Sequence, residues 1–258
     1  MPDPKPLVLI LGGTADAIAI ATALVAKADC RVLTSLAGKV KSPKSIPGET
    51  RVGGFGGAAG LQSFLTQNNV AAVIDATHPF AAQMSANARR ACDTTQIPRL
   101  QIRRPEWPRE AADTWIEVDT VAEAAARLPT LGTRAFLTVG LSELAPFRDL
   151  AAVWCLVRVV DTPAAPLLNG PHLTIAARGP FREDAERALL ETHRIDVVVT
   201  KHAGGSATYG KLKAARDLGI PVLMIRRPPP EPGDTGAPEE AVRWLGKQAG
   251  LRPDPRRS

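Results

Sequence analysis

The chain has 258 residues, of which 45% are hydrophobic and 22% are charged, and its formal net charge is +6 at pH 7. This length suits one large α/β domain or two small ones, and the hydrophobic content excludes general disorder. Basic residues are scattered and aromatic residues make up only 4% of the chain, so we expect no surface that stacks nucleic-acid bases. The positive charge suits a polyanionic small molecule better.

The N-terminus and the cysteines predict a cytoplasmic protein without membrane contact. Residues 1–6 alternate proline with charge, unlike a secretory signal, and the apolar stretch Ala17–Ala26 is far shorter than the ~20 residues that span a bilayer. Cys30, Cys92 and Cys155 are odd in number and widely spaced. We therefore expect neither a disulfide framework nor a metal site.

Short apolar, β-branched runs alternate with helical stretches in the first hundred residues, which predicts buried parallel strands joined by helices. The expected strands are Leu7–Leu11, Arg31–Thr34, Ala72–Asp75 and Arg99–Ile102. The expected helices between them are Ala17–Lys27, Gly60–Asn68 and Ala81–Cys92. This alternation is typical of a doubly wound sheet.

A second series of the same kind follows Arg103–Asp113, whose proline and charge predict a crossover between two lobes. Its expected strands are Trp115–Val118, Ala135–Val139, Val153–Val157, His172–Ala176, Asp196–Thr200 and Val222–Ile225. Arg227–Pro238 is too rich in proline and glycine for helix or strand, and Glu239–Ala249 is expected to form a closing helix.

The two series predict an α/β protein with two Rossmann-like lobes, mainly parallel sheets and a cleft between the lobes. The expected domains are residues 1–103, which bind a nucleotide cofactor, and residues 104–249, which bind substrate. Residues 250–258 are expected to form a flexible tail.

The first strand runs directly into Gly12-Gly13-Thr14 and then a helix, an order that presents backbone N–H groups and a positive helix end to a phosphate. The turn departs from the GxGxxG fingerprint, because Thr14 takes the place of the second glycine and Ala17 that of the third. A purely steric role for the glycines is the alternative.

The residues after the second strand predict which nucleotide binds. An NAD site usually has an acid there for the ribose 2′-hydroxyl, whereas a 2′-phosphate needs hydroxyls and cations. Ser35, Gly38 and Lys39 follow this strand without a carboxylate among them, which favours NADPH. A merely solvated lysine is the alternative.

Two further stretches of the first lobe suggest ligand contacts. Gly53–Gly57 holds four glycines in five positions, which suits a second anion-binding turn, a flexible lid or a simple loop. Asp75–Phe80 follows an apolar strand, and Pro79 biases His78 toward an extended conformation that can direct the imidazole into the cleft. For His78, proton donation and hydrogen bonding to a ligand are both open, and capping by Asp75 or Thr77 is the alternative.

In the second lobe, Arg178 and Lys201 each follow a strand, where they can face the first lobe's cofactor across the cleft or neutralise the acids at a helix start. Glu183 and Glu186, in the helix that begins after Arg178, are expected to be charges on an exposed helix face.

Taken in order, these motifs resemble the precorrin-6A reductase family, which includes the cobalt-precorrin-6A reductases. The resemblance covers roughly residues 7 to 228. It also includes Arg104-Pro105 with Trp107 and the run Lys211–Arg216. The motifs are GGT at Gly12–Thr14, SLAG at Ser35–Gly38, GGFGG at Gly53–Gly57, DATHPFA at Asp75–Ala81, RGPF at Arg178–Phe181 and KHAGG at Lys201–Gly205.

The resemblance implies an oxidoreductase of cobalamin biosynthesis that uses NADPH to reduce one double bond of precorrin-6A and give precorrin-6B. It implies a polycarboxylate tetrapyrrole substrate and allows handover to neighbouring enzymes of the pathway. Lys201 is the first candidate for the proton donor, His78 the second and solvent the third. By position, NADPH contacts fall on Gly12, Gly13, Thr14, Ser35, Gly38, Lys39, Gly54, Phe55, Gly56 and Thr77, and macrocycle contacts on Arg104, Trp107, Arg178 and Lys201.

This sequence departs from the family at Asp16, Lys39 and His202, where glutamate, arginine and asparagine are more usual. Lysine cannot form the two parallel hydrogen bonds that an arginine forms with a phosphate, so we expect Lys39 to bind a 2′-phosphate more weakly than an arginine would. Cobalt-precorrin-6A as substrate, a nonreducing two-lobed enzyme such as a glycosyltransferase, and a noncatalytic pigment binder are the alternatives.

Overall fold

The computed structural model describes residues 5–38, 45–161 and 163–248. The predicted NADPH contact Lys39 and the predicted tail 250–258 lie outside these residues. The chain divides into two compact units: the first joins residues up to Arg104 with those from Pro228 onward, and the second runs from Pro105 to Arg227. The expected second domain, 104–249, is therefore wrong at its C-terminal end.

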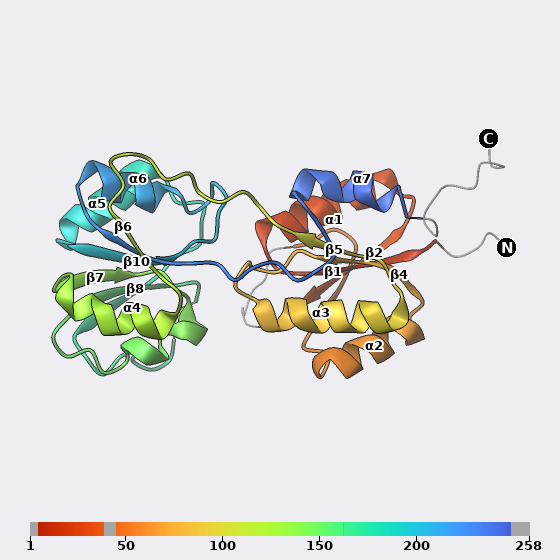
Figure 1. The fold of residues 1–258 in the computed structure, drawn as a ribbon, viewed down its shortest axis with the longest axis horizontal. Helices are drawn as coiled ribbons and strands as arrows, with labels where there is room; N and C mark the ends of the chain where they lie inside the picture. The colour runs from red at the N-terminus through yellow and green to blue at the C-terminus, as the bar shows by residue number, and fades with distance from the viewer. Residues whose placement is uncertain (1–4, 39–44, 162, 249–258) are drawn as a thin grey trace. The chain divides into compact units, whose positions relative to one another are not determined.

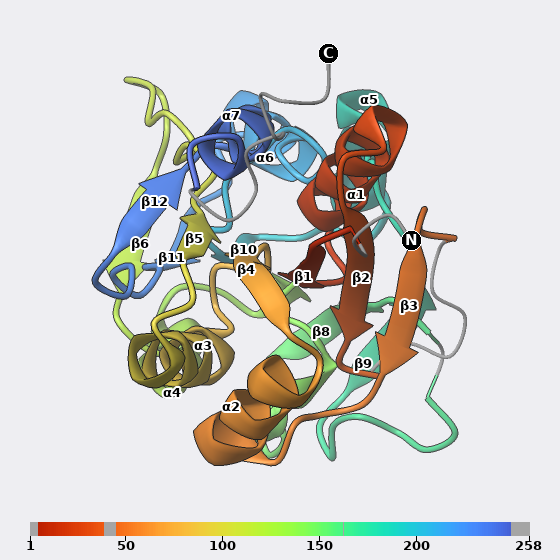
Figure 2. The same cartoon turned by 90° about the vertical axis from the view of Figure 1, so that its right-hand side faces the viewer.

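Within the described residues, the first unit contains a six-stranded parallel sheet in the order β12-β5-β4-β1-β2-β3 (Figure 2). Helices α1 and α7 cover one face of this sheet, and α2 and α3 cover the other (Figure 1). The strands are β1 (Leu7–Leu11), β2 (Arg31–Leu36), β3 (Glu49–Val52), β4 (Val70–Asp75), β5 (Arg99–Ile102) and β12 (Asp234–Gly236). The helices are α1 (Ala15–Lys27), α2 (Gly57–Gln67), α3 (Ala82–Thr95) and α7 (Ala241–Leu245).

Strand β1 lies in the interior of this sheet, between β4 and β2, and every residue of its run LVLIL is buried. Alternate side chains of the strand supply two separate cores. Val8 and Ile10 pack with residues of α1 and α7, and Leu9 and Leu11 pack with residues of α2 and α3. The continuous apolar run is thus typical of a strand buried on both faces.

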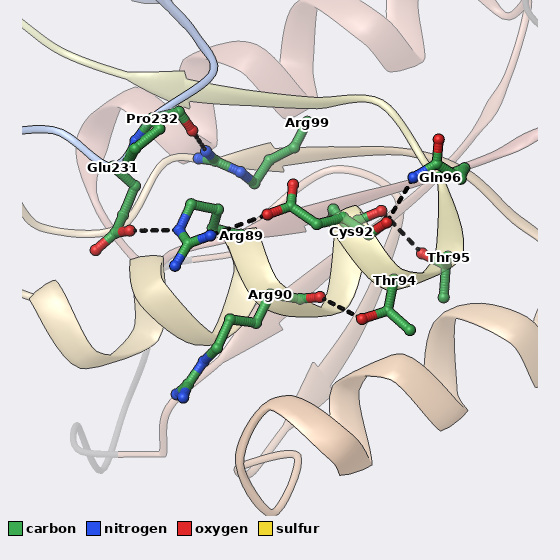
Figure 3. Close-up of polar contacts among 10 residues, drawn as sticks. Arg89, Arg90, Cys92, Thr94, Thr95, Gln96, Arg99, Glu231 and Pro232 are labelled. Atoms are coloured by element: carbon green, nitrogen blue, oxygen red, sulfur yellow. Dashed lines mark hydrogen bonds and ion pairs between the residues drawn. The ribbon is translucent and has the colours of Figure 1, made fainter.

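The segment after Arg227 returns to the first unit through polar contacts with α3 and β5 (Figure 3). Arg89 on α3 forms an ion pair with Glu231 at 2.7 Å, and Arg99 on β5 donates to the Pro232 carbonyl at 2.7 Å. These contacts set β12 beside β5, where Gly236 pairs with Ile102. The prediction of neither helix nor strand for Arg227–Pro238 is therefore wrong at β12.

The expected closing helix Glu239–Ala249 is shorter than predicted. A 3-10 turn, Pro238–Glu240, leads into α7, which ends at Leu245. Ala241 and Leu245 are buried in the core that α1 also lines. These apolar contacts therefore fix α7 to the first unit.

The second unit contains a six-stranded parallel sheet in the order β6-β11-β10-β7-β8-β9 among its described residues. Helices α5 and α6 cover one face, and α4 covers the other (Figure 1). The strands are β6 (Trp115–Val118), β7 (Arg134–Leu137), β8 (Trp154–Val159), β9 (His172–Ala176), β10 (Val197–Lys201) and β11 (Val222–Ile225). The helices are α4 (Val121–Arg127), α5 (Glu183–Thr192) and α6 (Gly210–Asp217), with 3-10 turns at Leu128–Thr130, Leu141–Glu143 and Ala145–Phe147.

Both sheets have the Rossmann strand order. Successive strands are added on one side of the first strand and then on its other side, and we call the point between them the chain reversal. In the first sheet this reversal falls between β1 and β4, and in the second it falls between β7 and β10. The edge strand on the side of β4 and β5 is β12 in the first sheet, and the corresponding edge strand of the second sheet, next to β11, is β6. The predicted α/β class with two mainly parallel Rossmann-like sheets is confirmed.

Candidate functional site

In the first unit, the glycine turn lies where open α/β sheets bind ligands, at the carboxyl ends of the strands beside the chain reversal. Leu11 at the end of β1 pairs with Asp75 at the end of β4. Thr14 ties the two strand ends together, because its hydroxyl donates to the Ala76 carbonyl at 2.8 Å. Gly12 N donates to the Ser35 carbonyl at 3.0 Å, so the end of β2 joins the same edge.

The turn suits an anion for two reasons. Thr14 caps α1 by accepting from Ala17 N at 3.1 Å, while in the described part of the chain the amides of Gly13 and Ala15 have no acceptor. A Cβ at Gly12 would lie 2.6 Å from the Ala17 Cβ, so only glycine fits there. Close helix packing and open N–H groups together form the cradle that phosphates bind.

The GGFGG turn follows β3 and opens α2. Gly56 is the residue before the helix and has a φ of 78°, a left-handed conformation that favours glycine. A Cβ at Gly54 or Gly56 would meet nothing within 4 Å, so these glycines border open space. The Phe55 ring packs against the Phe64 ring at 5.2 Å between centroids. The turn thus leaves backbone exposed beside the end of β2.

The end of β4 carries a hydrogen-bonded pair and an exposed imidazole. Asp75 is buried, and its Oδ1 accepts from the Thr77 hydroxyl at 2.6 Å and from Thr77 N at 3.2 Å. His78 is exposed, and its Nδ1 accepts from Phe80 N at 3.3 Å. In the neutral ring the proton of His78 therefore sits on Nε2.

In the second unit, a cation and a carboxylate meet beside the corresponding chain reversal. Lys201 ends β10 and forms an ion pair with Glu143, which lies in the 3-10 turn after β7. The Lys201 side chain is only 12% exposed. Thr138 donates from both its amide and its hydroxyl to the Val199 carbonyl at 3.0 Å, which holds the two strand ends together. Glu143 is a candidate residue that the sequence reading missed.

The same edge presents a second cation and apolar surface. Arg178, after β9, forms an ion pair with Asp161 at 3.2 Å, and its side chain is 33% exposed. Leu141 and Val160 are large hydrophobic side chains that are 54% and 47% exposed after β7 and β8. Exposed apolar side chains among cations suit a ligand with a hydrophobic body and acidic groups.

A buried ion pair lies beneath this edge. Arg158 on β8 forms two hydrogen bonds with Glu186 on α5, at 3.0 and 2.5 Å. The guanidinium also packs over the rings of Phe136 and Phe181, at 4.6 and 4.0 Å to their centroids. Glu186 is only 3% exposed, so the expectation of an exposed helix-face charge is wrong for it. Glu183 pairs with Lys213 on the surface, as expected of such a charge.

Lys211 joins this cluster from the first turn of α6. Its Nζ donates to the Thr208 carbonyl at 2.8 Å and lies 5.1 Å from the centroid of the Trp107 ring. Among the described residues no carboxylate pairs with it directly. Burial lowers its pKa from 10.5 to about 7, opposed by the charge of Glu186 and reinforced by that of Arg158.

We expect the stability of the second unit to rise with pH between about 7 and 8.5 because of Lys211. In this window the unfolded chain binds a proton that the folded chain does not, so the free energy of unfolding gains up to ~1.4 kcal/mol per pH unit. Urea unfolding of the wild type and of Lys211→Met across this window tests this. The wild-type curve should climb relative to the variant, and parallel curves would contradict a neutral lysine in the folded protein.

Trp107 and Arg104 lie in places the sequence did not predict. Trp107 is 5% exposed, stacks on His202 at 5.4 Å and donates to the Gly205 carbonyl at 2.5 Å. It belongs to the core of the second unit, so its expected exposure to substrate is not supported. Arg104 forms an ion pair with Asp16 in the first turn of α1 at 3.0 Å, beside the glycine turn.

Across residues 5–38, 45–161 and 163–248, no helix has the length and apolar character needed to cross a membrane. Over the same residues, no group of three or more histidine, cysteine or acidic side chains lies together in a way that could hold a metal ion.

Comparison with known proteins gives consistent relatives. The family profile described as "Precorrin-6x reductase CbiJ/CobK" matches residues 7–246. The precorrin-6A reductase of Rhodococcus erythropolis is 47% identical over 93% of this chain and 97% of its own length. The cobalt-precorrin-6A reductase of Salmonella typhimurium is 33% identical over 86% of this chain and 88% of its own.

A solved structure agrees with the sequence relatives. "CobK precorrin-6A reductase" superposes with a TM-score of 0.88 at 41% identity, covering 95% of this chain and 97% of that one. The family resemblance carried by the motifs is confirmed. The chain therefore belongs to the precorrin-6A reductase family, a family of oxidoreductases.

Proposed function

We propose that this protein uses NADPH to reduce one double bond of precorrin-6A and give precorrin-6B in cobalamin biosynthesis. The observation that carries the proposal is the glycine turn at the chain reversal of the first sheet, with amides that have no acceptor among the described residues. Family membership supplies the reaction class.

The first unit has the features that a dinucleotide needs. Gly12 leaves no room for a side chain, and the amides after it suit the pyrophosphate. Ser35 is the next-to-last residue of β2, and the described residues that follow it, Leu36 to Gly38, include no carboxylate. A 2′-phosphate therefore suits this strand end better than a bare 2′-hydroxyl. Phe55 and Thr77 complete the proposed cofactor contacts, on the GGFGG turn and after β4.

The second unit has features that suit a polycarboxylate macrocycle. Arg178 and Lys201 supply cations, and Leu141 and Val160 supply exposed apolar surface. Acetate and propionate groups pair well with such cations, and the ring body suits the apolar side chains. Substrate contact by Arg178 and Lys201 is part of the proposal.

NADPH, when bound, supplies a hydride to one carbon of the double bond, and a proton must reach the neighbouring carbon. The Lys201 ammonium group is the proposed donor. Glu143 pairs with it, which holds Nζ at the carboxyl edge of the sheet. His78, with its proton on Nε2, is the second choice.

The relatives favour a substrate without cobalt. Relatives named precorrin-6A reductase are 47% and 45% identical to this chain. Those named cobalt-precorrin-6A reductase are 33% and 31% identical. We therefore propose precorrin-6A as the preferred substrate over cobalt-precorrin-6A.

Incubating the protein with NADPH and precorrin-6A tests the function. We expect NADPH oxidation, bleaching of the substrate's absorption and a product heavier by two hydrogens, with little turnover of cobalt-precorrin-6A. Reactions without protein and without substrate are the controls. A folded protein that oxidises no NADPH with either macrocycle would contradict the proposed reduction, and faster turnover with NADH would contradict the cofactor choice.

A further inference from the structure

Arg51 is held rigidly at the carboxyl end of β3, next to the end of β2. Its Nη1 donates to the Ser35 hydroxyl at 2.7 Å and to the Gly53 carbonyl at 3.1 Å, and its Nη2 donates to the Gly54 carbonyl at 3.1 Å. The guanidinium lies over the Phe55 ring, 4.0 Å from its centroid. Three hydrogen bonds and a ring contact therefore fix both the position and the plane of this cation.

The charge of Arg51 is not neutralised within the described part of the chain, where no carboxylate pairs with it. Arg31, at the other end of β2, shows the contrast, because it forms an ion pair with Glu49 at 2.8 Å. Arg51 Nε, and one hydrogen of Nη2, have no acceptor among the same residues. A fixed cation with spare donors in a fork geometry is suited to a phosphate group.

The location identifies which phosphate. In Rossmann sheets the adenosine ribose lies at the end of the second strand, where an acid holds a 2′-hydroxyl and an arginine accommodates a 2′-phosphate. Ser35 occupies this strand end, and Arg51 is bonded to its hydroxyl. We propose that Arg51 binds the 2′-phosphate of NADPH and sets the preference for NADPH over NADH. The inference rests on the proposed function in taking NADPH as the reductant.

The competing explanation is that Arg51 only supports the GGFGG turn, whose carbonyls it bonds. Two variants separate these roles. Arg51→Met keeps an unbranched stem against Phe55 but removes the charge and the donors. Arg51→Lys keeps the charge but loses the fork. A merely structural role would affect all nucleotides alike, whereas a 2′-phosphate contact affects only those that carry one.

The experiment measures dissociation constants of the full-length protein for NADPH, NADH, 2′,5′-ADP and 5′-ADP by calorimetry. For Arg51→Met we expect NADPH and 2′,5′-ADP to bind roughly 10- to 100-fold more weakly, as for the loss of charge-assisted hydrogen bonds. NADH and 5′-ADP should change little, and Arg51→Lys should give a smaller loss. Arg31→Met removes the same charge from the far end of β2 and should leave all four constants unchanged.

The outcomes separate this inference from the proposed function. A wild type that binds NADH as tightly as NADPH would overturn the cofactor choice itself. A wild type that prefers NADPH, with Arg51→Met weakening all four ligands equally or keeping the preference, would overturn the role of Arg51 alone. If circular dichroism shows that Arg51→Met does not fold, the same comparison is made on Arg51→Lys, where an unchanged preference overturns the inference.

Discussion

Replacing Glu186 with alanine is expected to lower the free energy of unfolding of the second unit by about 3–5 kcal/mol, the usual cost of removing one partner from a buried ion pair. The substitution leaves the Arg158 guanidinium charged and buried between Phe136 and Phe181. It also removes the negative charge that faces Lys211. Urea unfolding followed by tryptophan fluorescence measures the effect, because three of the four tryptophans lie between Pro105 and Arg227.

Helix α5 offers a matched control. Glu191 is on the same helix and pairs with Arg187 at 3.2 Å, but its side chain is 53% exposed. Glu191→Ala should therefore cost no more than about 0.5 kcal/mol. The double change of Arg158 to Met and Glu186 to Leu should recover much of the loss, because no charge then remains buried without a partner. Equal effects of Glu186→Ala and Glu191→Ala would contradict the buried ion pair.

Glu186 also shows where sequence reasoning loses information. Its position in an acid-rich helix start is typical of solvent-exposed charges. Its burial depends on Arg158, 28 residues earlier, whose strand has no pattern that marks a buried cation. A pairing over this separation is set by tertiary packing. The interior apolar strands were predictable, because continuous hydrophobic runs indicate strands that are buried on both faces.

The missed strands have a related explanation. β3 has the sequence ETRV, largely exposed at an edge of the first sheet, and β12 is the short run DTG at the opposite edge. Edge strands need no apolar run, since only one side pairs and little surface is buried. The pairing of β12 with β5 also depends on the contacts of Arg89 with Glu231 and of Arg99 with Pro232. These residues are far apart in the sequence, so the sequence pattern does not indicate the pairing.

The residues of the candidate site likewise divide into those that the sequence indicated and those that it did not. Candidate residues at or just after the ends of strands, such as Gly12, Thr77 and Lys201, could be proposed from the sequence because the carboxyl ends of parallel strands meet at one edge. Glu143 and Arg51 were missed: one lies in a 3-10 turn, and the other is the third residue of an edge strand that the sequence does not indicate. The GGFGG motif two residues later was the available signal for Arg51.

Replacing Lys201 with methionine is expected to lower kcat by roughly 10²- to 10⁴-fold, the usual contribution of a general acid. Lys201→Arg separates proton donation from substrate binding: it keeps a cation for a substrate carboxylate, but a guanidinium does not give up its proton. This variant should restore KM and leave kcat low. Steady-state kinetics with precorrin-6A and NADPH measure both, and NADPH binding should not change, because the proposed cofactor contacts lie in the first unit.

The competing proton donors predict different kinetics. If solvent supplies the proton, Lys201→Met should raise KM alone, since it would remove only a substrate contact. If His78 supplies it, His78→Asn should lower kcat more than Lys201→Met does. Glu143→Gln adds a further check, because it removes the ion pair that positions Lys201 Nζ and should lower kcat with little change in KM. An unchanged kcat in Glu143→Gln together with normal turnover in Lys201→Met would remove the ion pair from the proton-transfer step.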